Sequence, residues 1–193
     1  LQPDYLGFIF YAPSPRFVGM DYIIPEHSPS IKRVGVFVNE TESVILHTAM
    51  LMKLDKVQLH GAESPALCAA IKSHGFGVVK AFSVDDTFDF TKTTPYQEAV
   101  DFMLFDTKGK HYGGNAVTFN WNVLERYNQK IPFFLSGGIA AENVSGIEKL
   151  MHMNLHALDI NSGVEDAPAL KSIQKIKQLK EQLSVVENNI KTK

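Results

Sequence analysis

The sequence predicts an α/β fold with a parallel sheet, because short apolar runs typical of strands alternate with longer runs typical of helices. A second observation is that polar residues follow nearly every strand-like run. An open doubly wound sheet collects such residues at one switch point, whereas a barrel has them at the carboxyl ends of all its strands. The barrel fits better, and we expect one (β/α)8 TIM-barrel domain over residues 1–193.

Seven runs are predicted to be the strands of this barrel. They cover residues 5–10, 33–38, 56–59, 77–82, 102–105, 133–135 and 156–160. A closed barrel of this class needs one strand more than these seven. We therefore expect the first strand and most of the first helix to be absent from the chain as given, so that they would precede Leu1.

The segments between the strands supply the predicted helices. Asn39 or Thr41 can cap the first, and Ser64 opens the second, which ends before Gly75. The first has an expected apolar face made by Val44, Ile45, Thr48, Leu51 and Met52. Short helices are expected at 121–127 and 141–151, and Pro168 is predicted to start the last helix, with Leu170, Ile173, Ile176, Leu179 and Leu183 at helical spacing.

Composition excludes several classes of protein. Hydrophobic residues make up 45% and charged residues 21%, and the formal net charge is -2, so neither nucleic acid nor an anionic membrane surface is an expected partner. No apolar run reaches the roughly 18 residues of a spanning helix, and no signal peptide is recognisable. Cys68 is the single cysteine, which fits a cytoplasmic protein, and we expect it to be a buried core residue.

The leading candidate for chemistry is Asp106, which ends the most apolar strand-like run and is suited to be a general acid or base. Two turns with glycines follow the last two strands, at Ser136, Gly137 and Gly138 and at Ser162 and Gly163. Backbone amides in such turns bind anions, and barrel enzymes often bind phosphate there. Each turn alone could be an ordinary loop, but the pair predicts a phosphate site.

Three further polar residues lie where a substrate would be held. Arg16 follows two prolines that stiffen its loop, and its planar guanidinium suits a carboxylate or phosphate. His60 and Asp159 are as compatible with structural roles as with substrate contact. The histidines lack metal-ligand spacing and no nucleotide-binding glycine pattern is present, so we expect no metal and no cofactor.

Several motifs, in the order in which they occur, resemble those of one enzyme family and cover almost the whole chain. They are Gly7-Phe-Ile-Phe-Tyr-Ala-Pro-Ser-Pro-Arg16, Val34-Gly-Val-Phe-Val-Asn39, Val57-Gln-Leu-His-Gly61, Val79-Lys-Ala81, Leu104-Phe-Asp-Thr107, Gly113-Gly114, Leu135-Ser-Gly-Gly-Ile139 and Leu158-Asp-Ile-Asn-Ser-Gly-Val-Glu165. On these residues the chain is similar to the phosphoribosylanthranilate isomerases of tryptophan biosynthesis, which are (β/α)8 barrels.

The resemblance implies an isomerase that converts N-(5-phosphoribosyl)anthranilate to 1-(2-carboxyphenylamino)-1-deoxyribulose 5-phosphate, an Amadori rearrangement without metal or cofactor. Asp106 matches the general acid that protonates the furanose ring oxygen. Arg16 matches the residue that holds the anthranilate carboxylate, and His60 and Asp159 match polar residues of the pocket. The two glycine turns match the phosphate-binding turns. The expected partner is the small-molecule substrate, and the expected state is a monomer or homodimer.

Two departures from the family pattern are visible. The family's general base is a cysteine on the first strand, and Cys68 does not match it in context; we expect the base in the segment that precedes Leu1. At Asn115-Ala116 the family commonly has a small residue and then glycine. Two alternatives stay open: a non-catalytic phosphosugar-binding barrel, and a relative of indole-glycerol-phosphate synthase, whose catalytic lysine and glutamate set is not found in this sequence.

Overall fold

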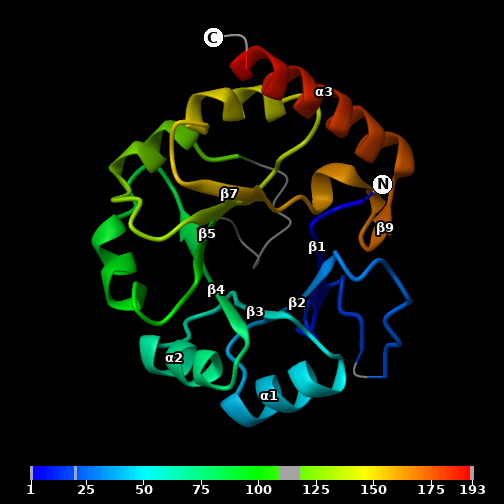
Figure 1. Cartoon of the computed structure of the whole chain (residues 1–193), viewed down its shortest axis with the longest axis vertical. Helices are drawn as coiled ribbons and strands as arrows, with labels where there is room; N and C mark the ends of the chain where they lie inside the picture. The colour runs from blue at the N-terminus through cyan, green and yellow to red at the C-terminus, as the bar shows by residue number, and fades with distance from the viewer. Residues whose placement is uncertain (1, 20, 109–117, 192–193) are drawn as a thin grey trace. The chain divides into compact units, whose positions relative to one another are not determined.

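The structure is a computed structural model that describes residues 2–19, 21–108 and 118–191. Seven strands form one sheet in the order β1-β2-β3-β4-β5-β6-β7, which confirms the predicted number, and the pairs β1–β2, β2–β3, β3–β4 and β6–β7 are parallel. The strands are β1 (Tyr5–Ile9), β2 (Lys32–Phe37), β3 (Lys56–Leu59), β4 (Gly77–Val84), β5 (Phe102–Thr107), β6 (Phe133–Leu135) and β7 (Leu155–Leu158) (Figure 1).

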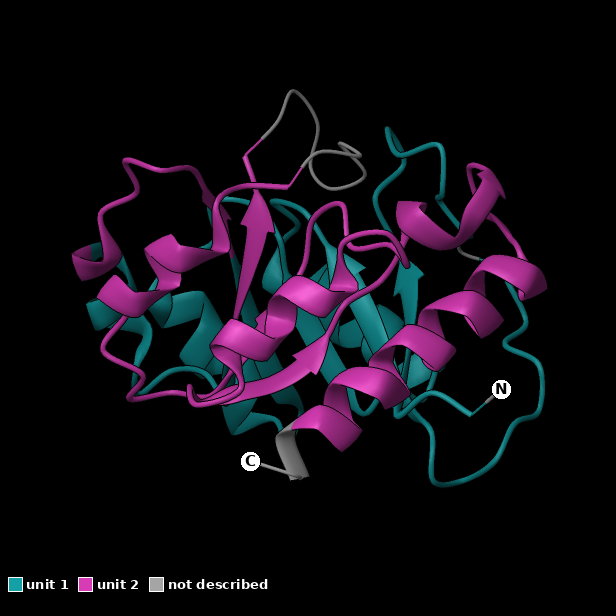
Figure 2. Ribbon diagram, turned by 90° about the horizontal axis from the view of Figure 1, so that it is seen from above, with its two compact units in different colours: residues 1–81, 92–103 teal, residues 82–91, 104–193 magenta. Residues whose placement is uncertain are grey.

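The chain forms two compact units, coloured teal and magenta in Figure 2. Unit 1 comprises residues 1–81 and 92–103, and unit 2 comprises residues 82–91 and 104–193. The motif Gly113-Gly114 and the departure at Asn115-Ala116 lie outside the described residues.

In unit 1, the helices α1 (Glu42–Leu51) and α2 (Pro65–Ser73) follow β2 and β3 (Figure 1). Both begin as predicted, since Thr41 and Ser64 accept hydrogen bonds from the backbone N–H three residues later. Asn39 does not cap α1. Its backbone has a φ of 55°, and its Oδ1 instead accepts a hydrogen bond from Ala62 N at 2.7 Å.

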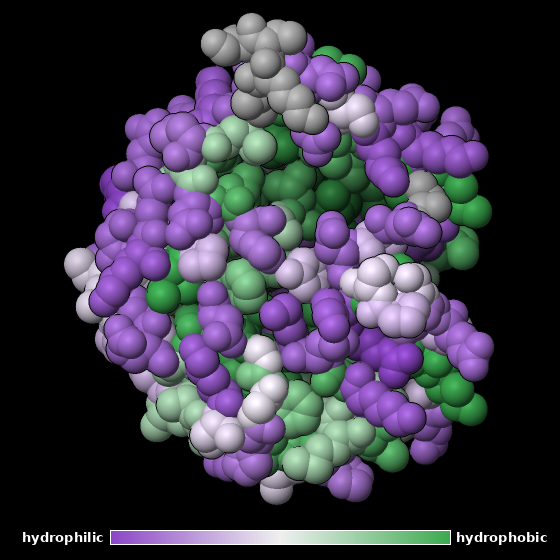
Figure 3. Space-filling view, in the orientation of Figure 1, coloured by the Kyte–Doolittle hydropathy of each residue, from purple (hydrophilic) through white to green (hydrophobic). Residues whose placement is uncertain are grey.

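The apolar face predicted for α1 is partly wrong. Ile45, Thr48 and Met52 are buried, but Val44 and Leu51 are exposed at 40% and 59%. The buried face of the helix is narrower than the sequence pattern indicates. On the face shown in Figure 3, polar residues are widespread and apolar residues form groups between them.

In unit 2, an aromatic cluster packs around Phe105 of β5. The ring of Phe105 meets the rings of Tyr127, Phe133 and Phe90 at centroid distances of 4.9, 5.5 and 5.5 Å, two of them edge-on and one tilted. Phe105 and Phe133 are fully buried. Because such rings each bury a large apolar area, this cluster fixes the strand that leads to Asp106.

The two segments predicted as short helices are 3-10 helices, η2 (Trp121–Arg126) and η3 (Val144–Leu150). Two further 3-10 helices, η1 (Phe90–Tyr96) and η4 (Ser162–Val164), were not predicted as helices. Buried side chains on η2 and η3, such as Leu124 and Ile147, still fill the core as amphipathic helices would. The first hydrogen-bonded turn of an α-helix is unfavourable to form, and segments this short add few further hydrogen bonds to offset that cost.

The prediction that Pro168 starts the last helix is wrong. Residues Glu165–Ala167 and Leu170–Lys171 form an antiparallel hairpin, β8–β9, and α3 begins at Ile173 and runs to Lys191. The turn places Ala169 at a φ of 67°, a conformation incompatible with a helix start. Leu170 is therefore exposed at 60%, whereas Leu179 is buried on α3. No helix in the described part of the chain is long and apolar enough to cross a membrane.

Candidate active site

Asp106 lies in β5, one residue before its end, and this strand carries it into the interior. The preceding residues Met103, Leu104 and Phe105 have no exposed surface, and Asp106 itself is 3% exposed. Its Oδ1 accepts a hydrogen bond from the backbone N–H of Thr107 at 2.9 Å. Burial of this kind withdraws the carboxyl group from bulk water, which suits a group that exchanges a proton with a bound molecule.

The turn after β6 lies against the end of β5. The backbone N–H of Ser136 donates to Phe105 O at 2.8 Å, which continues the pairing of the two strands. Gly137 has a φ of 91°, and a side chain there would collide with Thr107 Oγ1 and approach Asp106 Oδ1 to 2.8 Å. Glycine at this position is what allows the turn to lie beside the acid.

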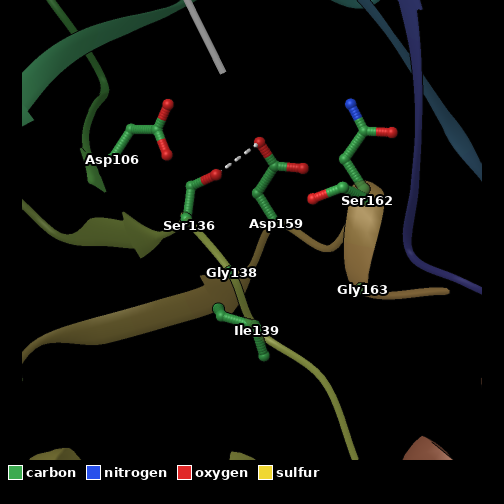
Figure 4. Close-up of a pocket in the computed structure, with 9 residues that line it drawn as sticks. Asp106, Ser136, Gly138, Ile139, Asp159, Ser162 and Gly163 are labelled. Atoms are coloured by element: carbon green, nitrogen blue, oxygen red, sulfur yellow. Dashed lines mark hydrogen bonds between the residues drawn. The ribbon is translucent and has the colours of Figure 1, made fainter. Parts of the chain in front are cut away.

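The turn after β7 approaches the turn after β6 just as closely. Asp159 N donates to Leu135 O at 2.8 Å, and Ser136 Oγ donates to Asp159 Oδ2 at 3.3 Å (Figure 4). A side chain at Gly163 would collide with the carbonyl of Ile139. Each turn therefore needs its glycine to reach its neighbour.

These two turns and Asp106 line one pocket of unit 2. Its lining consists of Asp106, Ser136, Gly137, Gly138, Ile139, Asp159, Asn161, Ser162 and Gly163, most of which are labelled in Figure 4. Seven of these nine are residues that the sequence singles out, so the structure brings them together. Ile139 and Asn161 were not singled out, although both lie within the motifs of the glycine turns. Asp159 was expected inside the last strand, but β7 ends at Leu158, so it belongs to the loop.

Arg16 and His60 belong to unit 1. Arg16 is half-buried, and its backbone N–H donates to Ser14 Oγ at 3.1 Å, which stabilises the proline-containing turn. His60 is buried, and its Nδ1 lies 2.9 Å from Gln58 Nε2 on the same face of β3. Local contacts thus hold the backbone at Arg16 and the ring of His60, and the spacing of the sequence alone could not reveal them.

Lys80, which lies in the middle of β4, forms a buried ion pair in unit 1. Its Nζ lies 3.0 Å from Glu63 Oε2, and the two side chains are 2% and 1% exposed. The same ammonium donates to the carbonyls of Leu59, Gly61 and Ala81. This pair fixes the loop after β3, in which Gly61 follows His60.

Neither a metal site nor a reactive thiol emerges from the described residues. No group of three or more histidine, cysteine, aspartate or glutamate side chains could hold a metal ion within the described ranges. Cys68 is buried in α2, and burial raises the pKa of its thiol from 9.0 to about 11. A thiol with so high a pKa is unsuited to remove a proton from a substrate near neutral pH.

The parallel sheet, with a pocket in the loops that follow β5, β6 and β7, defines an α/β fold of the TIM-barrel type. Two solved phosphoribosylanthranilate isomerases, from Thermotoga maritima and Thermus thermophilus, match it with TM-scores of 0.81 each, at 33% and 27% identity. They cover 94% and 95% of this chain, which in turn covers 88% of each of theirs.

The sequence comparisons identify the family. The chain belongs to the N-(5'-phosphoribosyl)anthranilate isomerase family, whose model matches residues 1–182. The isomerase of Parabacteroides distasonis is 41% identical over 187 residues, which are 95% of this chain and 85% of that protein. The isomerase of Phocaeicola vulgatus is 43% identical over 169 residues, 87% of this chain and 81% of its own length.

Proposed function

We infer that this protein converts N-(5-phosphoribosyl)anthranilate to 1-(2-carboxyphenylamino)-1-deoxyribulose 5-phosphate, the isomerase step of tryptophan biosynthesis. The observation that carries this inference is the buried Asp106 carboxyl in a pocket closed by two glycine turns. One solved relative, at 32% identity and with a TM-score of 0.78, is described in complex with the reduced form of this product.

In the proposed reaction, Asp106 is the general acid. It protonates the ring oxygen of the furanose while the bond from that oxygen to C1 breaks, which gives an iminium between C1 and the anthranilate nitrogen. A base then removes the proton from C2, and the resulting enamine tautomerises to the 2-ketone. Asp106 is suited to the first step because its strand fixes it in a buried position.

The two anionic ends of the substrate need separate anchors. We assign the phosphate to the turns at Ser136–Gly138 and Ser162–Gly163, which line the pocket and whose backbone N–H groups are donors of the kind that binds anions. Arg16 would bind the anthranilate carboxylate through its guanidinium fork. His60 and Asp159 would contact the sugar hydroxyls. The Ser136–Asp159 hydrogen bond supports an orienting role for Asp159.

For the general base, we propose a cysteine on a strand that precedes Leu1 in the intact protein. That strand would also complete a closed, eight-stranded, single-domain barrel. The buried Cys68, with its raised pKa, supports a base elsewhere. We further propose that the protein acts in the cytoplasm, as a monomer or homodimer, without cofactor.

A turnover assay on the full-length gene product, run beside the 193-residue chain, tests this function. We expect the full-length protein to consume phosphoribosylanthranilate and the shorter chain to be impaired by at least about a hundredfold, as expected when a general base is lost. Substrate binding without turnover by the full-length protein would instead support a non-catalytic phosphosugar-binding barrel, and a full-length chain without a cysteine in its first strand would contradict the proposed base.

A further inference from the structure

Asn161, one of the pocket residues outside the predicted set, is held by a lysine from the neighbouring hairpin. The ammonium of Lys171 donates to the backbone carbonyl of Asn161 at 2.9 Å and to its side-chain Oδ1 at 2.5 Å. Glu165 Oε1 lies 3.0 Å from the same ammonium and compensates its charge. The β8–β9 hairpin, which contains both Glu165 and Lys171, thus fixes the turn that starts at Asn161.

This contact determines which way the Asn161 amide faces. An ammonium has three donors and no acceptor, so the amide atom against Lys171 must be the oxygen. The nitrogen, Nδ2, is then the end of the amide that Lys171 does not hold. Among the described residues none accepts a hydrogen bond from Nδ2, and Asn161 lines the pocket. The side chain therefore has donor capacity left for a ligand.

The pocket gives this donor a chemical partner. Backbone N–H groups of the two glycine turns can donate hydrogen bonds to an anion, and the acidic side chains of Asp106 and Asp159 lie in the same lining. A neutral amide adds a further donor without forming an ion pair with either acidic side chain, as a lysine would. Hydrogen bonds to charged acceptors are among the strongest in proteins.

We propose that Asn161 Nδ2 donates to a phosphate oxygen of a bound phosphate monoester, and that Lys171 is a positioning residue that orients this amide. The inference rests on the proposed function, because it assigns a further contact in the proposed phosphate site. The inference also gives the β8–β9 hairpin, which was not predicted from the sequence, a role in substrate binding.

The test uses the full-length protein with Asn161→Ala, Lys171→Met and the double variant. Both the dissociation constant for inorganic phosphate and the KM for substrate are expected to rise about tenfold in each single variant, the effect of one lost hydrogen bond to a charged group. The kcat should change less than about twofold, because the contact is equal in ground and transition states. The double variant should resemble the single ones, because Lys171 acts through Asn161.

Two further variants keep the test independent of folding. Asn161→Asp retains the partner of Lys171 but replaces the donor by a charged acceptor, so it should weaken phosphate binding more than Asn161→Ala. Lys175→Met is the matched control, because Lys175 holds the same hairpin through Glu165 O and Asp166 Oδ1 without touching Asn161. Its phosphate affinity should stay within about twofold of wild type.

Unchanged phosphate affinity in Asn161→Ala, or equal losses in Lys171→Met and Lys175→Met, would overturn the inference while leaving the isomerase function intact. So would additive losses in the double variant. A protein that binds phosphate in this Asn161-dependent way but does not turn over phosphoribosylanthranilate would contradict the proposed function and support the inference.

Discussion

Cys68 shows how the environment of a single residue decides its chemistry. Its side chain has no exposed surface, and burial raises the pKa of the thiol to about 11. We predict that a thiol reagent modifies Cys68 at least about a hundredfold more slowly in the native protein than in denaturant, because the thiolate is the reactive form. Labelling followed by mass spectrometry measures both rates, and rapid native labelling would contradict the assignment.

The same shift predicts how stability depends on pH. The pKa is higher in the folded state than the ordinary value of 9.0, so the unfolded thiol ionises first as the pH rises. The contribution of Cys68 is therefore complete below pH 9 and is lost as the pH rises through about 11. The free energy of unfolding in urea, measured for wild type and Cys68→Ala across this pH range, isolates the contribution of Cys68. The remaining titrating groups are common to both proteins.

At the scale of elements, the buried Lys80–Glu63 pair joins the middle of β4 to the loop after β3. Glu63 also accepts hydrogen bonds from the backbone N–H groups of Asn39 and Gly61 at 2.8 and 2.9 Å. The pair is therefore the point at which the loops after β2 and β3 are fixed. Sequence alone places Lys80 in a strand-like run but cannot show that its partner is Glu63, seventeen residues earlier.

We predict that Lys80→Met lowers the free energy of unfolding by about 3–5 kcal/mol, because it leaves the Glu63 carboxylate buried without its counter-charge. Adding Glu63→Gln should restore part of the loss. Lys32→Met is the control, since the Lys32–Asp55 pair is exposed at 50% and 36% and should be worth less than about 1 kcal/mol. Urea denaturation measures all three, and equal effects of Lys80→Met and Lys32→Met would refute the role of the buried pair.

The elements also show where prediction from sequence reaches its limit. The strands were predictable because short, continuous apolar runs such as 102–105 and 133–135 are typical of strands buried in a parallel sheet. The 3-10 helices η2 and η3 could not be told from α-helices, because their apolar spacing is that of an α-helix. Their short length is what favours the 3-10 form. The β8–β9 hairpin was missed because Pro168 is equally typical of a helix start and of a tight turn, and the left-handed backbone of Ala169 is invisible in the sequence.

At the scale of the whole molecule, the candidate site was predictable to the extent that strand ends converge in a parallel sheet. Asp106, Asp159 and the two glycine turns come from three strands and line one pocket, as that rule requires. Asn161 was not predicted because its role depends on Lys171, which the hairpin brings to it. Convergence follows from topology, whereas the orientation of a side chain follows from its neighbours.

The central claim is that Asp106 is the general acid of phosphoribosylanthranilate isomerisation. Its most direct test is the turnover of Asp106→Asn in the full-length protein, measured together with the binding of the reduced product analogue. Because asparagine keeps the size of the side chain but cannot donate an acidic proton, we predict that kcat falls at least about a hundredfold while analogue affinity stays within about tenfold. Near-normal turnover of a folded Asp106→Asn protein would contradict the claim.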